Sequence, residues 1–372
     1  MHQLALIYST IKKALNFLTL TNHSFLNFFD IRTNKYLQLC IVLLLISSCK
    51  NETQTKVNSE IKVVKEIKPQ YTLTKDQTHN KFSSTIEPIL RVKSGAIVEA
   101  FTEDAFDEQF NINSTVEDLK NFNLDLVHPL TGPVYVEDAK PGDVLKITLH
   151  EIEVGDWGWN AIVPGFSFVA DSIEGSYLRT YKLGKDVTHV NFKDNIRLEL
   201  NPFPGVMGVA PATSELLSTI PPRANGGNMD DPNMTKGTTI YFPVFVEGGL
   251  FSIGDGHALQ GHGEVCGTAI EVPLRVIYEI ELVKNKTIKE PQYETDDYYA
   301  TTGFGTTIDE AAKKATLYMI DYLMTEYKLT QLEAYALCSL SGDLKIAETV
   351  DVPHMLVTMH ISKNIFEDDK KD

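Results

Sequence analysis

Residues 270–283, IEVPLRVIYEIELV, carry the clearest structural pattern of the chain. Apolar side chains recur at every second position: Val272, Leu274, Val276, Tyr278, Ile280 and Leu282. The intervening positions carry Arg275, Glu279 and Glu281. Because successive side chains of a strand point to opposite faces, this alternation predicts a β-strand with one buried face.

The sequence on the N-terminal side of this stretch predicts further strands. Residues 88–101 (PILRVKSGAIVEAF) indicate two short strands around a Ser-Gly turn, and residues 138–154 indicate a Pro-Gly-Asp turn followed by a strand. Residues 237–254 indicate two strands joined by Gly248-Gly249. Strands separated by turns at regular intervals predict a mainly β fold class.

Helices are predicted only near the C-terminus. Thr307 and Glu310 have the spacing of a capping box, and a helical pattern follows as far as about Glu326. Thr330 and Glu333 repeat this spacing, and Gly342 is a suitable helix stop. The chain is therefore expected to end in a C-terminal helical hairpin.

The composition is that of a globular protein with an excess of acidic residues. Apolar residues make up 43% of the 372 positions, which is enough for a substantial core. The 34 basic and 50 acidic residues give a formal net charge of −16, which argues against nucleic acid as a partner. The four cysteines, Cys40, Cys49, Cys266 and Cys338, are too scattered for a disulfide framework.

A segment near the N-terminus predicts export. Arg32 and Lys35 precede an apolar stretch over residues 36–46 that is too short to span a bilayer comfortably, and the small residues of ISSC lead to Cys49. This pattern resembles the lipobox of bacterial lipoproteins, in which the cysteine is lipidated. We therefore expect a lipoprotein held at the membrane of a bacterial cell envelope, facing the periplasm or the exterior.

This interpretation divides the chain into four parts. We expect a lipoprotein-type signal peptide over 1–48 with an unusually long start, Cys49 and a flexible tether over 49–70, a folded domain over 71–366 and a charged tail over 367–372.

The polar loop GDGHALQGHGEVCGTAIE, residues 254–271, is the strongest candidate for chemistry. Asp255 and His257 lie two positions apart, so a strand would present both side chains on one face. Asp and His commonly bind divalent metals together, and Glu264 can act as a general base. The spacing alone supports a catalytic loop and an ordinary polar turn about equally.

Other loops add candidates of lower specificity. The Pro- and Gly-rich run NPFPGVMGVAPA (201–212) fits either a rigid pocket wall or a connector. In PPRANGGNMDDP (221–232), Asn228 and Asp230 can bind a substrate, a cation or their own backbone. Asp104 follows a predicted strand, and His79 taken alone favours an ordinary structural histidine.

Several of these motifs together resemble the acetamidase/formamidase family of amide hydrolases. The resemblance is carried by GGNMDDP, by GTTIYFPVFVEGGLFSIGDGHALQGHGEVCGTAIEVP, by HNKFSSTIEPILRVKSGAIVEAFTEDA and by the central blocks HPLTGPVYVEDAKPGDVLKITLHEIEV and NPFPGVMGVAP. LSGDLKIAETVDVPHMLVTMHIS matches the C-terminal end, so that the similarity covers about residues 71–366.

The resemblance implies sandwich-like β sheets with a smaller α/β part, and hydrolysis of short linear amides to a carboxylate and ammonia. It also implies a homo-oligomer. Carried over by position, it implies the following site residues: His79, Asp104, Asn228, Asp230, Asp255, His257 and Glu264. His262 departs from the acidic or amide residue expected there, which leaves the substrate preference and the metal affinity open.

We expect a divalent metal, zinc in the first instance, on Asp255 and His257 with Asp104 or Asp230 as a further ligand. Such a metal would lower the pKa of its bound water to about 7 and polarise the amide. Glu264 would move the water proton to the leaving nitrogen, and Asn228 would orient the carboxamide.

Two alternatives remain open from the sequence. Cys266 can be a nucleophile with Glu264 or His262 as its base, although a lone cysteine at the start of a strand is more often buried. The chain can also be an envelope lipoprotein that binds an amide or carbamate without turnover.

Overall fold

The computed structural model describes residues 67–367. The predicted signal peptide, Cys49 and most of the tether lie outside these residues, as does most of the charged tail. Within the described part of the chain, no helix is both long enough and apolar enough to cross a membrane.

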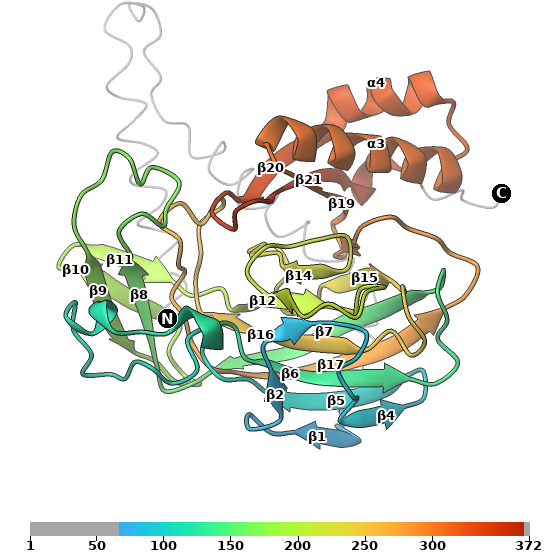
Figure 1. The fold of residues 1–372 in the computed structure, drawn as a ribbon. Coiled ribbons are helices and arrows are strands. Elements are labelled where there is room, and N and C mark those ends of the chain that lie inside the picture. The colour runs from blue at the N-terminus through green and yellow to red at the C-terminus, as the bar shows by residue number, and fades with distance from the viewer. Residues whose placement is uncertain (1–66, 368–372) are drawn as a thin grey trace, which may run out of the picture. The chain divides into compact units, whose positions relative to one another are not determined.

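Most strands of residues 67–367 belong to two sheets (Figure 1). The larger sheet has nine strands, here in spatial order: β1 (Tyr71–Leu73), β5 (Ala96–Phe101), β17 (Leu274–Val283), β7 (Val144–Val154), β15 (Thr239–Pro243), β18 (Gln292–Glu294), β19 (Tyr298–Gly305), β21 (Met355–Ser362) and β20 (Gly342–Glu348). Apart from β1, which pairs with β5 in parallel, neighbouring strands are antiparallel.

The smaller sheet carries more of the site residues. Its order is β14 (Gly226–Asn228), β12 (Phe203–Gly208), β16 (Phe251–His257), β6 (Leu130–Val136) and β2 (Thr78–His79), with β4 (Leu90–Val92) pairing in parallel with β6. In the 237–254 segment, β15 lies in the large sheet and β16 in the small one. Gly248 and Gly249 therefore connect strands of two different sheets and not the two strands of a hairpin.

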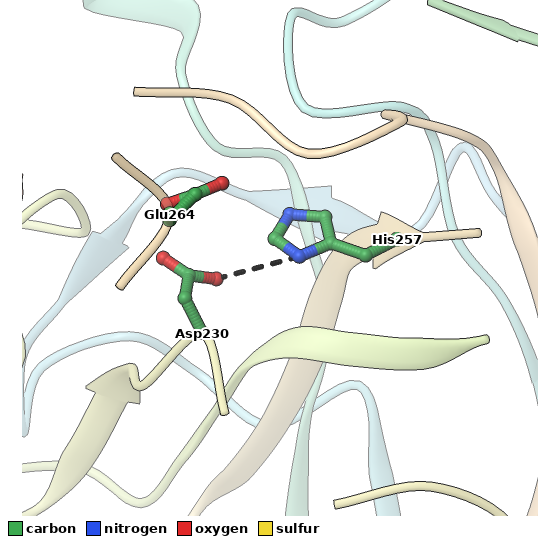
Figure 2. A group of neighbouring side chains, drawn as sticks. All are labelled: Asp230, His257 and Glu264. Atoms are coloured by element: carbon green, nitrogen blue, oxygen red, sulfur yellow. Dashed lines mark ion pairs between the residues drawn. The ribbon is translucent and has the colours of Figure 1, made fainter. Parts of the chain in front are cut away.

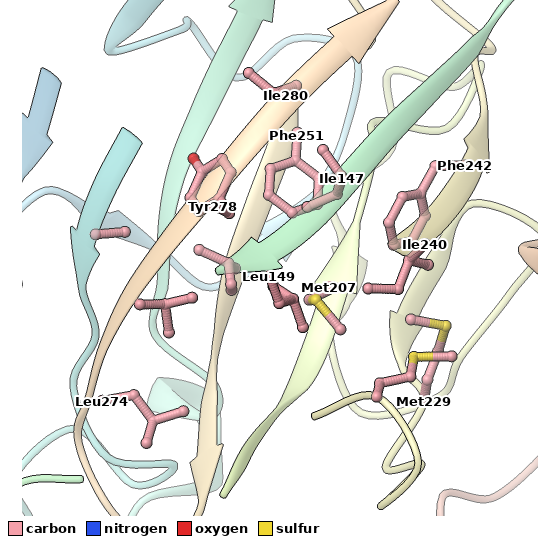
Figure 3. Packing of buried hydrophobic residues seen from close by; sticks show 14 of the residues in the cluster. Ile147, Leu149, Met207, Met229, Ile240, Phe242, Phe251, Leu274, Tyr278 and Ile280 are labelled. Carbon is pink, nitrogen blue, oxygen red and sulfur yellow. The ribbon is translucent and has the colours of Figure 1, made fainter. Parts of the chain in front are cut away.

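The main hydrophobic core lies between the two sheets (Figure 3). Tyr278 of β17 packs against Phe251 of β16 with ring centroids 5.4 Å apart, and Phe251 also packs against Phe242 of β15. All three side chains are buried. The alternating apolar residues predicted for 270–283 thus bury one face of β17, and the mainly β, sandwich-like fold class is confirmed.

The two α-helices of the described chain pack on the large sheet around β19 and β21 (Figure 1). Helix α3 (Ile308–Glu326) begins at Thr307, whose side chain accepts a hydrogen bond from Glu310 N. Helix α4 (Gln331–Ser341) has the full capping box of Thr330 and Glu333 and ends at Gly342. The predicted C-terminal helical hairpin and its boundaries are confirmed.

Shorter elements complete the fold. Three two-stranded pairs are β3 (Lys81–Phe82) with β13 (Leu217–Ser218), β8 (Trp157–Ile162) with β9 (Tyr177–Lys182), and β10 (His189–Lys193) with β11 (Ile196–Glu199). The 3-10 turns are η1 (Asp118–Lys120), η2 (Leu124–Leu126) and η3 (Lys363–Ile365). The loop after β5, the region around η2 and the turn after β8 reach the cavity described next.

Candidate active site

A cavity of about 230 Å³ opens beside the ends of β14 and β16. Its polar side is built from five places: the segment before β6, the end of β14 and the turn after it, the end of β16, the loop that follows β16, and the connection between β20 and β21. The polar residues that line it include His128, Asn228, Asp230, Asp255, His257, Glu264, Glu271 and Asp351. These eight residues are all buried.

His257 lies at the centre of this group. Its Nε2 is 3.1 Å from Glu271 Oε2 and 3.5 Å from Asp255 Oδ2. Its Nδ1 is 2.8 Å from Gln260 Oε1 and 3.7 Å from Asp230 Oδ1. The imidazole therefore stands between two pairs of carboxylates.

Gln260 fixes the proton on this imidazole. The Gln260 side-chain Nε2 donates to the backbone carbonyl of Asp230 at 2.6 Å, and a carbonyl can only accept. The Gln260 oxygen must then face His257, so Nδ1 of His257 carries a hydrogen and donates it. The lone pair of neutral His257 is consequently on Nε2, toward Asp255 and Glu271.

Asp230 and Glu264 form the second carboxylate pair, and both lie beside His257 (Figure 2). Ligand atoms of Asp230, His257 and Glu264 lie within 4.8 Å of one another, and the same holds for Asp255, His257 and Glu271. The sequence-predicted residues Asp230, Asp255, His257 and Glu264, which come from separate loops and strands, are thus brought together.

The hydrogen bonding of the cluster fits a bound cation. Four buried oxygens in this group have no hydrogen-bond partner: Asn228 Oδ1, Asp230 Oδ1, Asp255 Oδ1 and Glu271 Oε2. Buried carboxylate oxygens are rarely left unpaired, and several of them facing one space require a cation or protons. The oxygen-rich set with one imidazole suits a divalent metal.

Gly205 of β12 lets these groups approach one another. A Cβ on Gly205 would lie 2.3 Å from Asp230 Oδ1 and 2.8 Å from Asp255 Oδ2. No larger residue fits this position without displacing both carboxylates. The glycine belongs to the run 201–212, which the sequence suggested as a pocket wall or a connector.

The electrostatics of the cluster set Asp255 apart from the other carboxylates, since burial raises the pKa of Glu271 to about 7 as well. Burial opposes ionisation of Asp255, but the imidazoles of His128 and His257 outweigh burial and lower its pKa to about 2. Burial raises the pKa of Asp230 to about 6 and that of Glu264 well above its usual range, each reinforced by nearby carboxylates. Asp255 therefore holds its charge, whereas Asp230 and Glu264 are suited to exchanging protons near neutral pH.

Three of the site carboxylates also sit on strained backbone. Asp230, Asp255 and Glu264 have φ values of 40°, 53° and 44°, in the left-handed region that favours glycine. Residues other than glycine keep this conformation only where the surroundings enforce it, and such residues cluster at functional sites.

Asn228 presents an acceptor to the cavity. Its Nδ2 donates to Asp351 Oδ2 at 2.8 Å, which orients the carboxamide, while Oδ1 has no partner. Asp351 in turn follows Glu348, whose Oε2 accepts from the backbone of Val350 and Asp351. Asn228 can therefore receive an N–H from a bound molecule.

Two sequence candidates, Asp104 and His79, are not brought to this group. The Asp104 carboxylate accepts from the backbone of Phe106 and Glu108 and from Trp159 Nε1, at 2.9 to 3.2 Å. His79 contacts Ser252 Oγ at 2.8 Å and the carbonyl of Lys81 at 2.7 Å. Neither residue lines the cavity. Their side chains hold the loop after β5 and the β2–β16 region in place.

Cys266 lies beside a neighbouring pocket rather than in this cavity. Its Sγ is 3.4 Å from the carbonyl of Thr268 and 3.7 Å from that of Ala161. His262 lines the same neighbouring pocket, and its Nε2 is 3.5 Å from Asn233 Nδ2. Neither side chain is positioned to act on a molecule held by Asp230 and Asp255.

Sequence reasoning missed Glu271, His128 and Asp351. Glu271 lies at the start of the 270–283 stretch, where its position matched the polar face of the strand. β17 begins only at Leu274, so Glu271 belongs to the loop and turns inward. Glu271 could have been found from the sequence, because it is an acidic residue close to the loop of Asp255 and His257. No neighbouring motif in the sequence marks His128 or Asp351.

Comparisons with known proteins show the family of this chain. The chain matches the Acetamidase/Formamidase family over residues 64–218 and 212–368. It is 27% identical over 370 residues to a formamidase of Methylophilus methylotrophus, covering 79% of this chain and 90% of that protein.

Solved structures give the same result. The chain is similar to a predicted acetamidase/formamidase of Thermoanaerobacter tengcongensis, with 34% identity and a TM-score of 0.74, over 79% of this chain and 96% of that one. It is also similar to an acetamidase of Bacillus halodurans, with 30% identity and a TM-score of 0.74, over 79% and 98% of the two chains.

Proposed function

This chain belongs to the acetamidase/formamidase family, and we propose that it hydrolyses linear amides to a carboxylate and ammonia in the cavity around His257. It is thus an amidohydrolase that acts on linear amide C–N bonds. In this reaction, water supplies oxygen to the carbonyl carbon, the C–N bond breaks, and the nitrogen leaves after it gains a proton.

We propose that Asp255, His257 and Glu271 hold a divalent metal, zinc in the first instance. The observation that supports this choice is the contact of Gln260 with Nδ1, which leaves Nε2 of His257 to face the carboxylates of Asp255 and Glu271. A bound metal of this kind lowers the pKa of water and polarises a carbonyl. The sequence indicates Asp104 or Asp230 as the further ligand. Asp104 does not line the cavity and Asp230 faces Nδ1 of His257, so we propose Glu271 instead.

Glu264 is the proposed general base, with Asp230 beside it. Burial and the neighbouring carboxylates raise the pKa values of both groups, so their proton affinity lies closer to neutral pH than that of ordinary carboxyls. Glu264 accepts the proton from the attacking water and passes it to the departing nitrogen. Asn228 Oδ1 accepts from the substrate carboxamide and fixes which face of the carbonyl meets water.

The proposal is tested by ammonia release from residues 50–372 before and after chelation, with formamide, acetamide and propionamide as substrates. We expect turnover to vanish on chelation and to return with zinc. Turnover that persists in rigorously metal-free enzyme would contradict the metal assignment, but the proposed amide hydrolysis would still hold. Intact amide recovered after incubation with zinc-loaded enzyme would contradict hydrolysis and favour binding alone.

We also propose that the protein is anchored in the cell envelope through lipidated Cys49. The proposal depends on the order of positive charge, short apolar stretch and ISSC in residues 32–49. Expression of the full chain and of its Cys49→Ala variant in a bacterial host, followed by membrane fractionation, tests it. Membrane recovery that depends on Cys49 supports the anchor, and equal recovery of both proteins in the membrane-free fraction contradicts it.

A further inference from the structure

Part of the cavity lining is apolar, and we infer that this apolar side selects the acyl group of the substrate. This inference rests on the proposed amide hydrolysis. We propose that the preferred substrate is a primary amide whose acyl group is uncharged, apolar and about as large as a phenyl ring. Formamide and acetamide would then be poor substrates of this enzyme.

The apolar wall comes from four segments that are distant in sequence. It consists of Phe106, Phe122, Val127, Val163, Phe166 and Ile220. The wall faces the cavity from the loop after β5, the η1–η2 region, the turn after β8 and the segment after β13. The hydrogen of formamide and the methyl group of acetamide are too small to contact all six of these apolar side chains.

The wall is held in place by its own packing. Phe106 stacks on Phe122 with ring centroids 4.9 Å apart and meets Trp159 edge-on at 4.8 Å. Phe166 donates its backbone N–H to Val163 O, and its ring lies so close to Gly267 that a Cβ there would approach it to 2.6 Å. The apolar side is therefore formed before a ligand arrives, as most ligand pockets are.

The size of the cavity decides the size of the acyl group. An apolar cavity of 150 Å³ in another protein holds a benzene molecule, and this cavity measures about 230 Å³. A carboxamide with a phenyl-sized group fills that space, whereas acetamide leaves most of it to water. Water against the aromatic wall finds few hydrogen-bond partners, so its displacement by an apolar group favours binding.

The apolar wall excludes other acyl groups. It offers neither an ionic nor a hydrogen-bonding partner, so a carboxylate or a polar chain buried against it would lose its hydration without compensation. Asn228 Oδ1 is the acceptor that places the carboxamide at the acidic end. The acyl group must then extend toward Phe106 and Phe122.

The experiment compares kcat/KM of the zinc-loaded enzyme for acetamide, phenylacetamide and succinamate. We expect phenylacetamide to exceed acetamide by at least about 30-fold, since each additional apolar group in such a pocket contributes roughly tenfold or more. Succinamate carries a carboxylate where phenylacetamide carries its ring, and its kcat/KM is expected to be lower than that of acetamide.

Two variants assign this preference to the wall. Val163→Phe fills the cavity and is expected to lower the phenylacetamide-to-acetamide ratio of kcat/KM by at least about tenfold. Phe122→Ala enlarges it and is expected to shift the preference toward a bulkier naphthylacetamide. Ile196→Phe, on the exposed side of β11, is the matched control and leaves the ratio as it is.

Each outcome has a distinct meaning. Acetamide turned over as fast as phenylacetamide, or a ratio that neither wall variant changes, overturns the acyl-group inference and leaves amide hydrolysis standing. No ammonia from any of the amides with zinc supplied overturns both.

Discussion

The side-chain oxygen of Gln260 lies 2.8 Å from Nδ1 of His257, while the nitrogen of the same carboxamide is bonded to the carbonyl of Asp230 at 2.6 Å. One glutamine thus joins the strand that carries His257 to the turn that carries Asp230. The contact keeps a proton on Nδ1 and leaves Nε2 for the side of Asp255 and Glu271. Partners of this kind orient metal-binding histidines and usually strengthen their hold on the metal.

We expect Gln260→Met to weaken zinc binding by about 10- to 100-fold, because the imidazole loses its orienting partner. Zinc affinity is measured by competition with a chromogenic chelator, and the tautomer of His257 by 15N NMR of histidine-labelled protein. Gln331→Met, on the exposed surface of α4, is the control. Unchanged zinc affinity in Gln260→Met would place the metal away from His257 Nε2.

Asp255→Asn and Asp104→Asn should fail in different ways. We expect Asp255→Asn to lose measurable zinc binding and turnover, because it removes a charged ligand. Asp104→Asn should keep its zinc affinity but lose about 1–3 kcal/mol of unfolding free energy, since an amide group cannot accept every hydrogen bond that the carboxylate accepts.

Zinc titration and urea unfolding of both variants measure this contrast. A loss of zinc affinity in Asp104→Asn with unchanged stability would restore Asp104 as a ligand.

Glu264→Gln should lower kcat by about 10²- to 10⁴-fold, which is the usual contribution of a general acid–base group. Zinc affinity should stay within a few-fold, because the proposed zinc ligands are Asp255, His257 and Glu271, whereas Glu264 is grouped with Asp230. Steady-state kinetics over a range of pH, together with zinc titration, measure both effects. A variant with near-normal kcat would remove Glu264 from the proton-transfer step.

Cys266→Ala and Cys266→Ser should both keep kcat/KM within about twofold, since surface or partly buried positions away from the chemistry contribute little. The Sγ atom points to the carbonyls of Ala161 and Thr268 and lines the neighbouring pocket. Ammonia release and thiol-reagent inactivation of the parent enzyme provide the measurements. Loss of turnover in both variants, without loss of stability, would restore the covalent mechanism.

His79 should contribute to the pH dependence of stability rather than to turnover. Burial lowers its pKa from 6.5 to about 4, so between these pH values the unfolded chain binds a proton that the folded chain does not. Stability therefore falls as the pH drops from about 6.5 to about 4, by about 3 kcal/mol from this group.

Urea unfolding between pH 7.5 and pH 4 compares the parent protein with His79→Gln. The variant should show a shallower decline, and parallel curves would contradict the structural role of this histidine. Turnover of His79→Gln at pH 7.5 is the control for a catalytic role.

The sequence by itself determined features that depend on near neighbours. The alternation in 270–283 predicts a strand because side chains of a strand alternate in direction, and the Thr330–Glu333 spacing predicts a helix start because it matches one turn. The two-residue spacing of Asp255 and His257 likewise puts both side chains on one face of β16. These rules need only a few consecutive residues.

The tertiary structure alone decided which polar groups meet. Glu271, His128 and Asp351 reach the cavity because the small sheet brings β6, β14 and β16 together and the β20–β21 connection returns to them. Asp104 and His79 are of the same residue types as the cavity residues. Asp104 instead accepts hydrogen bonds from backbone N–H groups, and His79 contacts Ser252. Spacing along the chain cannot distinguish these cases, because strand pairing over long sequence separations determines which side chains are left to face one cavity.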